Sequence, residues 1–137
     1  LYEGNRPVLR YLSSMWSRTG LISFLFSSQG GIKLLNIKTI ASKCAWGKSS
    51  LLLCAVPESI PNVTEGLPDD WYQGRIKFSD SLSYINPTNG EIFPLYSFES
   101  KSGGMDITNI KLSSENILIS FINKTDGTLW PLKTNKI

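Results

Sequence analysis

The sequence predicts an all-β fold built from small antiparallel sheets. The main observation is a pattern that occurs three times, in which an apolar residue precedes a four-residue polar or glycine-containing turn and a run of strand-forming residues. The three copies are Trp16–Phe24, Trp46–Cys54 and Leu112–Ser120. In each copy the apolar residue and the first strand residue are five positions apart, so the turn occupies the same place. Hairpins repeated in this way are typical of β-propeller blades, which are small antiparallel sheets arranged in a ring.

The composition fits one compact domain or part of one. The chain has 137 residues, of which 41% are hydrophobic and 18% are charged, which is far from the composition of disordered proteins. Its net charge of +3 comes from lysines and arginines that are scattered singly, whereas nucleic-acid binding needs cations gathered on one face. The longest apolar run, Leu51–Val56, is much shorter than the roughly 20 residues that cross a bilayer. We therefore expect no nucleic-acid partner and no transmembrane segment in this chain.

The first unit, at about residues 8–40, is expected to contain three strands. Val8–Trp16 and Leu21–Phe26 are rich in residues that favour strands, and the polar residues between them can close a hairpin. A pair of glycines then turns the chain into a third strand, Ile32–Ile37. The unit is too short for the four strands of a complete blade, so either its outer strand is missing or Lys38–Trp46 serves two positions.

The second unit, at about residues 41–100, is expected to contain four strands and a long inserted loop. The strands are Ser42–Trp46, Leu51–Val56, Ser81–Asn86 and Glu91–Phe98. Pro57 ends the second strand, because proline cannot donate a hydrogen bond to a strand ladder. Residues 57–78 are rich in proline and glycine, which indicates a loop between two strands of one blade. Asn89 and Gly90 mark the turn between the last two strands.

The third unit, at about residues 105–134, is expected to contain three strands. These are Asp106–Leu112, Ile117–Asn123 and Thr128–Leu132, with Asp126 and Gly127 in the turn between the last two. Three tryptophans also occur at positions that the repeats share. Because blades pack against one another at such positions, we expect Trp16, Trp46 and Trp130 in the core.

Several segments resemble the WD40-like, TolB-type bacterial β-propellers, whose repeats are also called PD40 repeats. Asn123–Trp130 is similar to the turn and third strand of such blades. Leu112–Asn116 stands where those blades have a Ser-Pro-Asp-Gly-type turn, although the proline and the glycine are replaced here. Three further runs resemble a set found in bacterial propellers of this kind: Lys43–Trp46, Cys54–Pro57 and Leu67–Gly74.

The resemblance covers about residues 8–134 and implies a propeller fold without implying an activity. Propellers include scaffolds, ligand-binding proteins and enzymes, so the fold alone does not identify the function. A ring closes with at least about four blades, whereas this chain supplies two to three. We therefore expect residues 1–137 to be the C-terminal part of a propeller whose remaining blades lie upstream.

The two cysteines, Cys44 and Cys54, are expected to lie opposite each other in a hairpin. A turn centred between Lys48 and Ser49 pairs these two positions across the strands. The cysteines then either form a disulfide, after a modest adjustment of their Cβ separation, or remain reduced as small buried hydrophobic residues. Export from the cytoplasm would favour the disulfide. Two cysteines without histidine do not supply the four ligands of a structural zinc site, so we expect no metal.

The chain contains no histidine, which excludes several kinds of catalytic site from these residues. Ser-His-Asp and Cys-His arrangements and histidine-ligated metals are absent, and there is no phosphate-binding loop or dinucleotide fingerprint. We therefore expect no cofactor and no catalytic residues. A pair of carboxylates could still act in glycoside hydrolysis, and Asp69 and Asp70 are adjacent. Adjacent aspartates after a proline are more typical of a solvated turn or a cap, which is the role expected here.

The inserted loop carries the candidate binding residues, which combine aromatic surface with hydrogen-bonding groups. They are Asp69, Asp70, Trp71, Tyr72, Gln73 and Arg75. This mixture is typical of binding hot spots, and long loops in compact domains often carry function. The alternative interpretation is structural. In that case Trp71 and Tyr72 fold back over the blade edge, and Asp80 accepts hydrogen bonds from loop amides.

Two hypotheses for the function follow from these observations. The first is a non-catalytic binding or scaffold propeller of the cell envelope or exterior, which engages a protein or glycan partner through loops at one face and exposes Trp71 and Tyr72. The second is an accessory propeller of a hydrolase similar to prolyl oligopeptidase, with its catalytic domain outside this chain. We favour the first because no catalytic domain follows the last unit. A cytosolic structural repeat without a ligand is a weaker third hypothesis.

Overall fold

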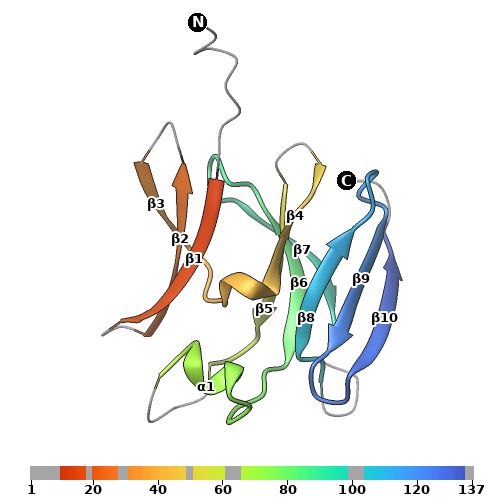
Figure 1. The fold of residues 1–137 in the computed structure, drawn as a ribbon. Helices are drawn as coiled ribbons and strands as arrows, with labels where there is room; N and C mark the ends of the chain where they lie inside the picture. The colour runs from red at the N-terminus through yellow and green to blue at the C-terminus, as the bar shows by residue number, and fades with distance from the viewer. Residues whose placement is uncertain are drawn as a thin grey trace, which may run out of the picture.

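The computed structural model describes residues 10–17, 20–27, 31–48, 51–60, 66–98 and 104–134. Within these ranges the chain forms ten strands in three antiparallel sheets, so the predicted all-β class is confirmed. The strands are β1 (Arg10–Ser17), β2 (Gly20–Ser27), β3 (Gly31–Leu35), β4 (Cys44–Trp46), β5 (Leu52–Pro57), β6 (Asp80–Ile85), β7 (Ile92–Ser97), β8 (Ile107–Leu112), β9 (Leu118–Asn123) and β10 (Thr128–Lys133). The three sheets lie side by side, with the four-stranded sheet in the middle (Figure 1).

The first sheet contains β1, β2 and β3 in that order, as the sequence predicts for this unit. Side chains alternate between its two faces, and Leu25 of β2 is buried against the middle sheet. On the other face the register pairs Phe24 with Leu34 and Phe26 with Ile32. Ile32 and Leu34 are 65% and 62% exposed. The first sheet therefore presents an apolar outward face.

The middle sheet has the order β4, β5, β6 and β7, and the chain leaves it after Pro57, as predicted. Its strand β5 is buried on both sides. Leu53 and Ala55 face the third sheet, whereas Leu52 and Cys54 face the first. A continuous apolar run is what a strand requires when other layers cover both of its faces.

The third sheet has the order β10, β9 and β8. Ile119 and Phe121 of β9 point inward and join the core that this sheet shares with the middle sheet. Leu129 of β10 pairs with Ile122 of β9 and lies on the other face, where it is 70% exposed. This sheet, like the first, has one buried face and one partly apolar outward face.

The turn between β9 and β10 contains several side-chain hydrogen bonds. Asn123 Oδ1 accepts a hydrogen bond from the backbone N–H of Asp106 at 3.2 Å. Asp126 Oδ1 accepts hydrogen bonds from Thr128 Oγ1 at 2.6 Å and from its N–H at 3.0 Å, and these bonds hold the pKa of Asp126 below its usual value. Trp130 Nε1 donates to Thr128 Oγ1 at 2.7 Å. The turn is thus fixed by its own side chains.

The structure corrects the predicted positions of two tryptophans. Trp46 and Trp130 are each 39% exposed, although the repeat pattern placed them in the core. Trp46 is the last residue of β4, and Trp130 lies on β10, the last strand of its sheet. The side chain of Trp16 lies outside the described residues. The five-residue spacing matches the register of the first hairpin, in which Trp16 pairs with Leu21, but Trp46 pairs with Leu52 and Leu112 pairs with Ile119. The repeats therefore predict the hairpins but neither a common register nor how deeply the flanking side chain is buried.

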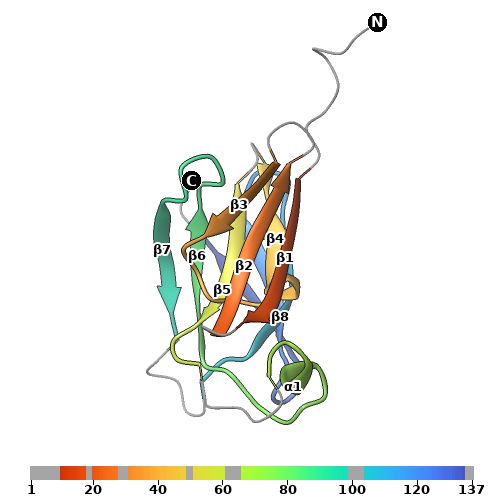
Figure 2. The same cartoon turned by 90° about the vertical axis from the view of Figure 1, so that its left-hand side faces the viewer.

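Short helical segments lie among the strands in the part of the chain that the structure describes. A 3-10 helix, Ala41–Lys43, precedes β4, and α1 (Asp69–Tyr72) lies between β5 and β6. The single turn of α1 corrects the prediction that residues 57–78 form only a loop. Figures 1 and 2 show α1 at one end of the sheets. Within the described residues, no helix has the length and apolarity needed to cross a membrane.

Candidate functional site

The segment that carries α1 is held together by the side chain of Asp70. This carboxylate is 2% exposed, and its Oδ2 accepts a hydrogen bond from the backbone N–H of Gly66 at 3.2 Å. Its Oδ1 lies 3.0 Å from Nη1 of Arg75, whose side chain is about half exposed. Two of the candidate binding residues, Asp70 and Arg75, thus form an ion pair within the segment. Asp70 has the structural role expected of a turn or cap.

Trp71 anchors the segment to the sheets. Its side chain is 1% exposed, so the prediction of an exposed Trp71–Tyr72 pair is wrong for Trp71. The indole Nε1 donates to both carboxylate oxygens of Asp106, at 2.9 and 3.0 Å. The carbonyl oxygen of Trp71 accepts a hydrogen bond from Lys124 Nζ at 2.8 Å. The ring of Phe78 stacks on the indole with a centroid distance of 6.5 Å, so the side chain is fixed on several sides.

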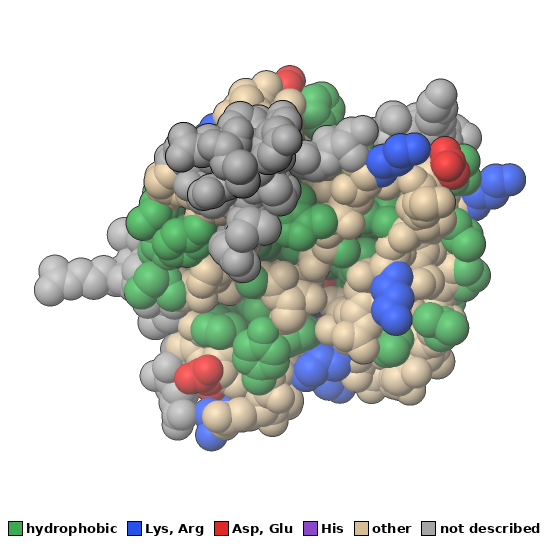
Figure 3. All heavy atoms as spheres, turned by 45° about the horizontal axis from the view of Figure 1, so that its top comes forward, with side chains coloured by type: hydrophobic (Ala, Val, Ile, Leu, Met, Phe, Trp, Pro, Cys, Tyr) green, Lys and Arg blue, Asp and Glu red, His purple; other side chains and the backbone are tan. Residues whose placement is uncertain are grey.

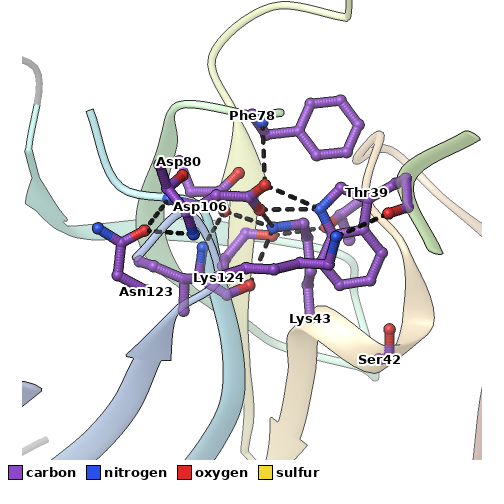
Figure 4. Close-up of polar contacts among 12 residues, drawn as sticks. Thr39, Ser42, Lys43, Phe78, Asp80, Asp106, Asn123 and Lys124 are labelled. Atoms are coloured by element: carbon purple, nitrogen blue, oxygen red, sulfur yellow. Dashed lines mark hydrogen bonds and ion pairs between the residues drawn. The ribbon is translucent and has the colours of Figure 1, made fainter. Parts of the chain in front are cut away.

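A buried group of charges lies directly beneath Trp71, and we call it the Lys43 cluster: Lys43, Asp80 and Asp106. Lys43 is 0% exposed, and its Nζ donates to Asp80 Oδ2 at 2.5 Å, to Asp106 Oδ1 at 2.7 Å and to the carbonyl oxygen of Ile107 at 2.9 Å (Figure 4). The rings of Trp71 and Phe78 flank the ammonium group, with centroids 4.6 and 5.2 Å from Nζ. The cluster therefore joins the 3-10 helix to the starts of β6 and β8.

The two carboxylates of the cluster have different surroundings. Asp106 accepts hydrogen bonds from Trp71, from Lys43 and from the backbone N–H of Phe78 at 3.3 Å. Asp80 Oδ2 accepts from Lys43 and from the backbone N–H of Ile107, but Asp80 Oδ1 has no hydrogen-bond partner among the described residues. Burial raises the pKa of Asp80 from 3.8 to about 6, although the charge of Lys43 opposes that shift.

The structural interpretation expected Asp80 to accept hydrogen bonds from amides of the loop, and in the structure this role belongs to its neighbour in the cluster. It is Asp106 that accepts hydrogen bonds from the segment, through the indole of Trp71 and the amide of Phe78. The backbone N–H of Glu58, at the start of the same connection, donates to the carbonyl oxygen of Ser79 at 2.9 Å. The connection between β5 and β6 is thus closed at its base and anchored at its middle.

The remaining candidate residues are exposed on α1 and just after it. Tyr72 is 54% exposed, and its hydroxyl donates to Ser42 Oγ at 2.8 Å. Asp69 and Gln73 are also exposed. Asp69 points to solvent whereas its neighbour Asp70 is buried, so the structure does not bring the two carboxylates together as a catalytic pair. The segment therefore offers an aromatic ring, an amide and a carboxylate on a fixed support.

A groove lies next to Ser42, the residue that Tyr72 contacts. It has a volume of about 680 Å³ and runs along the outward face of the third sheet. Its lining residues are Ser42, Cys44, Asn109, Ile110, Lys111, Ser120, Ile122 and Leu129. The lining mixes small polar groups with aliphatic side chains and contains one cation. Within the described parts of the chain, no three His, Cys, Asp or Glu side chains are grouped to hold a metal ion.

Cys44, which lines this groove, is paired with Cys54 across β4 and β5. The predicted register is confirmed, since these two residues are direct partners in the hairpin. Their sulfur atoms form a disulfide, and their Cα atoms are 4.1 Å apart. The disulfide fixes the short strand β4 to the middle of the core. It therefore also fixes the 3-10 helix that carries Lys43 and Ser42.

Sequence reasoning did not identify the Lys43 cluster. Its members are far apart in the chain, since Lys43 precedes Asp80 by 37 residues and Asp106 by 63. One signal was present: each aspartate directly precedes, or opens, an apolar strand, which is an unusual place for an unpaired charge. Comparisons of the chain with protein families, with characterised proteins and with solved structures found no match. The functional interpretation therefore depends on the geometry of the described residues.

Proposed function

We propose that this chain is part of a β-propeller that binds a protein or glycan partner, without catalysis, through the segment that carries α1. The observation on which this proposal depends is the contrast within that segment. Trp71 is buried and held by a charged cluster, while the adjacent Tyr72 is more than half exposed. A surface group on a fixed support loses little conformational entropy when it binds, and this favours recognition.

The arrangement of the sheets supports the propeller interpretation. The first strands of the three sheets are linked at one place, because β4 contacts β8 and the 3-10 helix contacts both β1 and β8. In a propeller the first strands of successive blades line a common axis. The middle sheet is covered on both faces, as a blade between two blades would be.

The outward faces of the two flanking sheets also support further blades. The exposed apolar side chains on these faces are Met15, Phe26, Ile32 and Leu34 on the first sheet, and Leu118 and Leu129 on the third. Figure 3 shows hydrophobic side chains at the surface on both sides of the stack. Apolar patches of this kind mark surfaces that pack against something else. In the proposed propeller, neighbouring blades cover both faces.

The disulfide supports a location outside the cytoplasm. Cys44 and Cys54 form a bond that persists in oxidising compartments and is rare in reducing ones. We therefore place the proposed binding protein in the cell envelope or among exported proteins. Such a location agrees with a glycan or a surface protein as the partner.

The proposal is tested with an array of defined cell-envelope oligosaccharides and, for protein partners, with a photo-crosslinking amino acid placed at position 72 or 93. Tyr72→Ala should weaken binding by about tenfold or more, because an aromatic hot-spot residue contributes roughly 1.4 kcal/mol or more. Phe93→Ala is the matched control, since Phe93 is a similarly exposed aromatic residue on β7, and it should leave binding unchanged. Equal losses in both variants, or crosslinks from position 93 alone, would refute the proposed surface.

A further inference from the structure

The Lys43 cluster has an arrangement that a simple ion pair does not require. A single ammonium group lies within hydrogen-bonding distance of two carboxylates, and all three side chains are at most 1% exposed. The aromatic rings of Trp71 and Phe78 border the ammonium and exclude water from it. The fully buried ammonium group of Lys43 is closed to substrates from solution. Any chemistry in the cluster therefore takes place between its own members.

Formation of an amide from an amine and a carboxylic acid needs three conditions. The amine must lose its proton, the acid must be uncharged when it is attacked, and water must be kept away so that the amide is not hydrolysed. A buried site meets the last condition directly, and burial also favours the neutral forms of an amine and an acid over two separate charges. A second carboxylate beside the pair can carry the proton from one group to the other.

We infer that Lys43 and Asp80 condense spontaneously to form an intramolecular amide, with Asp106 as the proton carrier. Asp106 first relays one proton from Nζ of Lys43 to Asp80, which leaves a neutral amine and a neutral carboxyl group, and the Nζ lone pair then attacks Cγ of Asp80. Asp106 takes up a second proton from Nζ as this bond forms. The new N–C bond forms as one C–O bond breaks, and the departing oxygen leaves as water after it receives the proton held by Asp106. An ammonium and a carboxylate are thereby converted to one amide and one water, without an oxidant or a cofactor.

The surroundings of the two carboxylates distinguish their roles. Asp106 is held on both oxygens by Trp71 Nε1 and also receives the amide of Phe78, which suits a group that remains a carboxylate before and after the reaction. Asp80 has an oxygen without a partner among the described residues, and burial raises the pKa of its carboxyl group to about 6. Asp80, whose neutral form burial favours, is thus the acid that is attacked.

The site also offers a route for the water that is released. A recess of about 130 Å³ reaches Asp106 and is lined by Gly74, Ile76, Lys77, Asp106, Lys124 and Thr125. The amide would tie the 3-10 helix before β4 to the first residue of β6. The residue before β4 would then be linked covalently to β6 by the amide, while the disulfide already links β4 to β5.

The mass of the intact, reduced protein tests this inference directly. The purified protein should weigh less than its sequence by the mass of one water. Tryptic digestion should give a branched peptide in which Thr39–Lys48 is joined to Phe78–Lys101, without cleavage after Lys43. Lys48→Arg, at an exposed lysine, is the matched control and should keep the mass loss.

Variants of the cluster separate the proposed roles. Lys43→Arg and Asp106→Asn should both have the full sequence mass, the first because the nucleophile is gone and the second because the proton carrier is gone. Any mass that Asp80→Asn loses should be that of ammonia, since an amide group would then be the one attacked, and loss of water from this variant would overturn the role of Asp80. The wild-type measurement decides the matter even if a variant fails to fold. A folded wild-type protein with its full sequence mass and no branched peptide would overturn the inference.

Discussion

Asp80 is the residue whose protonation most directly links pH to stability. Its pKa is about 6 in the folded protein and 3.8 when the side chain is fully hydrated, so the folded state binds the proton more tightly. The contribution of this group to stability is therefore complete below pH 3.8 and is lost as the pH rises to about 6. Two pKa units correspond to about 3 kcal/mol.

The prediction is that the free energy of unfolding of Lys43→Arg, which keeps the cation but cannot form the amide, falls from pH 4 to pH 6 and then levels off, relative to Lys43→Arg combined with Asp80→Asn. Urea denaturation of both proteins at several pH values measures this difference. The slope belongs to molecules in which the Asp80 carboxyl group is free, because an amide with Lys43 does not titrate. If the difference in free energy of unfolding between the two proteins instead rises with pH over this interval, burial does not control the pKa of Asp80.

A single buried hydrogen-bond donor, Nε1 of Trp71, contributes to the free energy of unfolding. Trp71→Phe keeps an aromatic ring but leaves the buried Asp106 without the two contacts to Nε1. We expect a loss of about 1–3 kcal/mol in the free energy of unfolding. Tyr72→Phe also removes a donor, but at an exposed site, and should change stability very little. Urea denaturation of the two variants gives the comparison, and equal effects would mean that Trp71 is not an anchor.

Among the elements, β4 depends most on a covalent bond. It is three residues long, and the disulfide joins it to β5 across a sequence separation of 10. Replacing both Cys44 and Cys54 with alanine should lower the free energy of unfolding by about 2–3 kcal/mol, since a loop of this length is no longer closed in the unfolded chain. Thermal unfolding with and without a reducing agent measures the effect. If reduction destabilises the double variant as much as the wild type, the disulfide is not the cause.

The connection between β7 and β8 contains a close approach of two segments. Gly104 has φ +69°, and a Cβ atom at this position would lie 2.4 Å from Ser79 Oγ. Gly104→Ala should therefore be more destabilising than Gly90→Ala, where φ is +77° but no atom lies within 4 Å of the added methyl group. Ser79→Gly should rescue part of the first loss and none of the second. Chemical denaturation of the four proteins tests this, and similar losses at both glycines would remove the steric explanation.

The elements that sequence reasoning predicted well are those specified by local residues. The hairpin of Cys44 and Cys54, the end of β5 at Pro57 and the turn at Asn86–Gly90 all follow from turn chemistry and proline geometry. The burial of Trp71 and the exposure of Trp46 and Trp130 depend instead on which layer covers each strand. Such information is not present in a local pattern.

The Lys43 cluster could not be predicted for a related reason. Three charged residues from distant parts of the chain look like ordinary surface charges until the sheets bring them together. The only local indication is that Asp80 and Asp106 stand at the starts of apolar strands. Burial of a charge becomes tolerable only when its partners are present, so the tertiary fold and the cluster depend on each other.

At the scale of the whole molecule, the outward faces of the first and third sheets determine how it associates. The face of the first sheet includes Ile32 and Leu34, both largely exposed. If these residues normally contact another sheet, the isolated chain should associate through them. Ile32→Ser combined with Leu34→Ser should shift the isolated chain toward the monomer in analytical ultracentrifugation. The matched variant Phe93→Ser, on β7, should leave the association unchanged. An equal shift in both variants would mean that the association does not depend on the outward face of the first sheet.

The measurement that tests the central claim most directly is an experimental structure of the protein as isolated from the cells that produce it. The account predicts further antiparallel sheets on the outward faces of the first and third sheets, arranged around an axis beside β1, β4 and β8, with Ile32, Leu34 and Leu129 buried. It also predicts that Tyr72 stays on the surface of that ring. A folded monomer in which both outward faces meet solvent, or in which another element covers Tyr72, would contradict the proposed binding propeller.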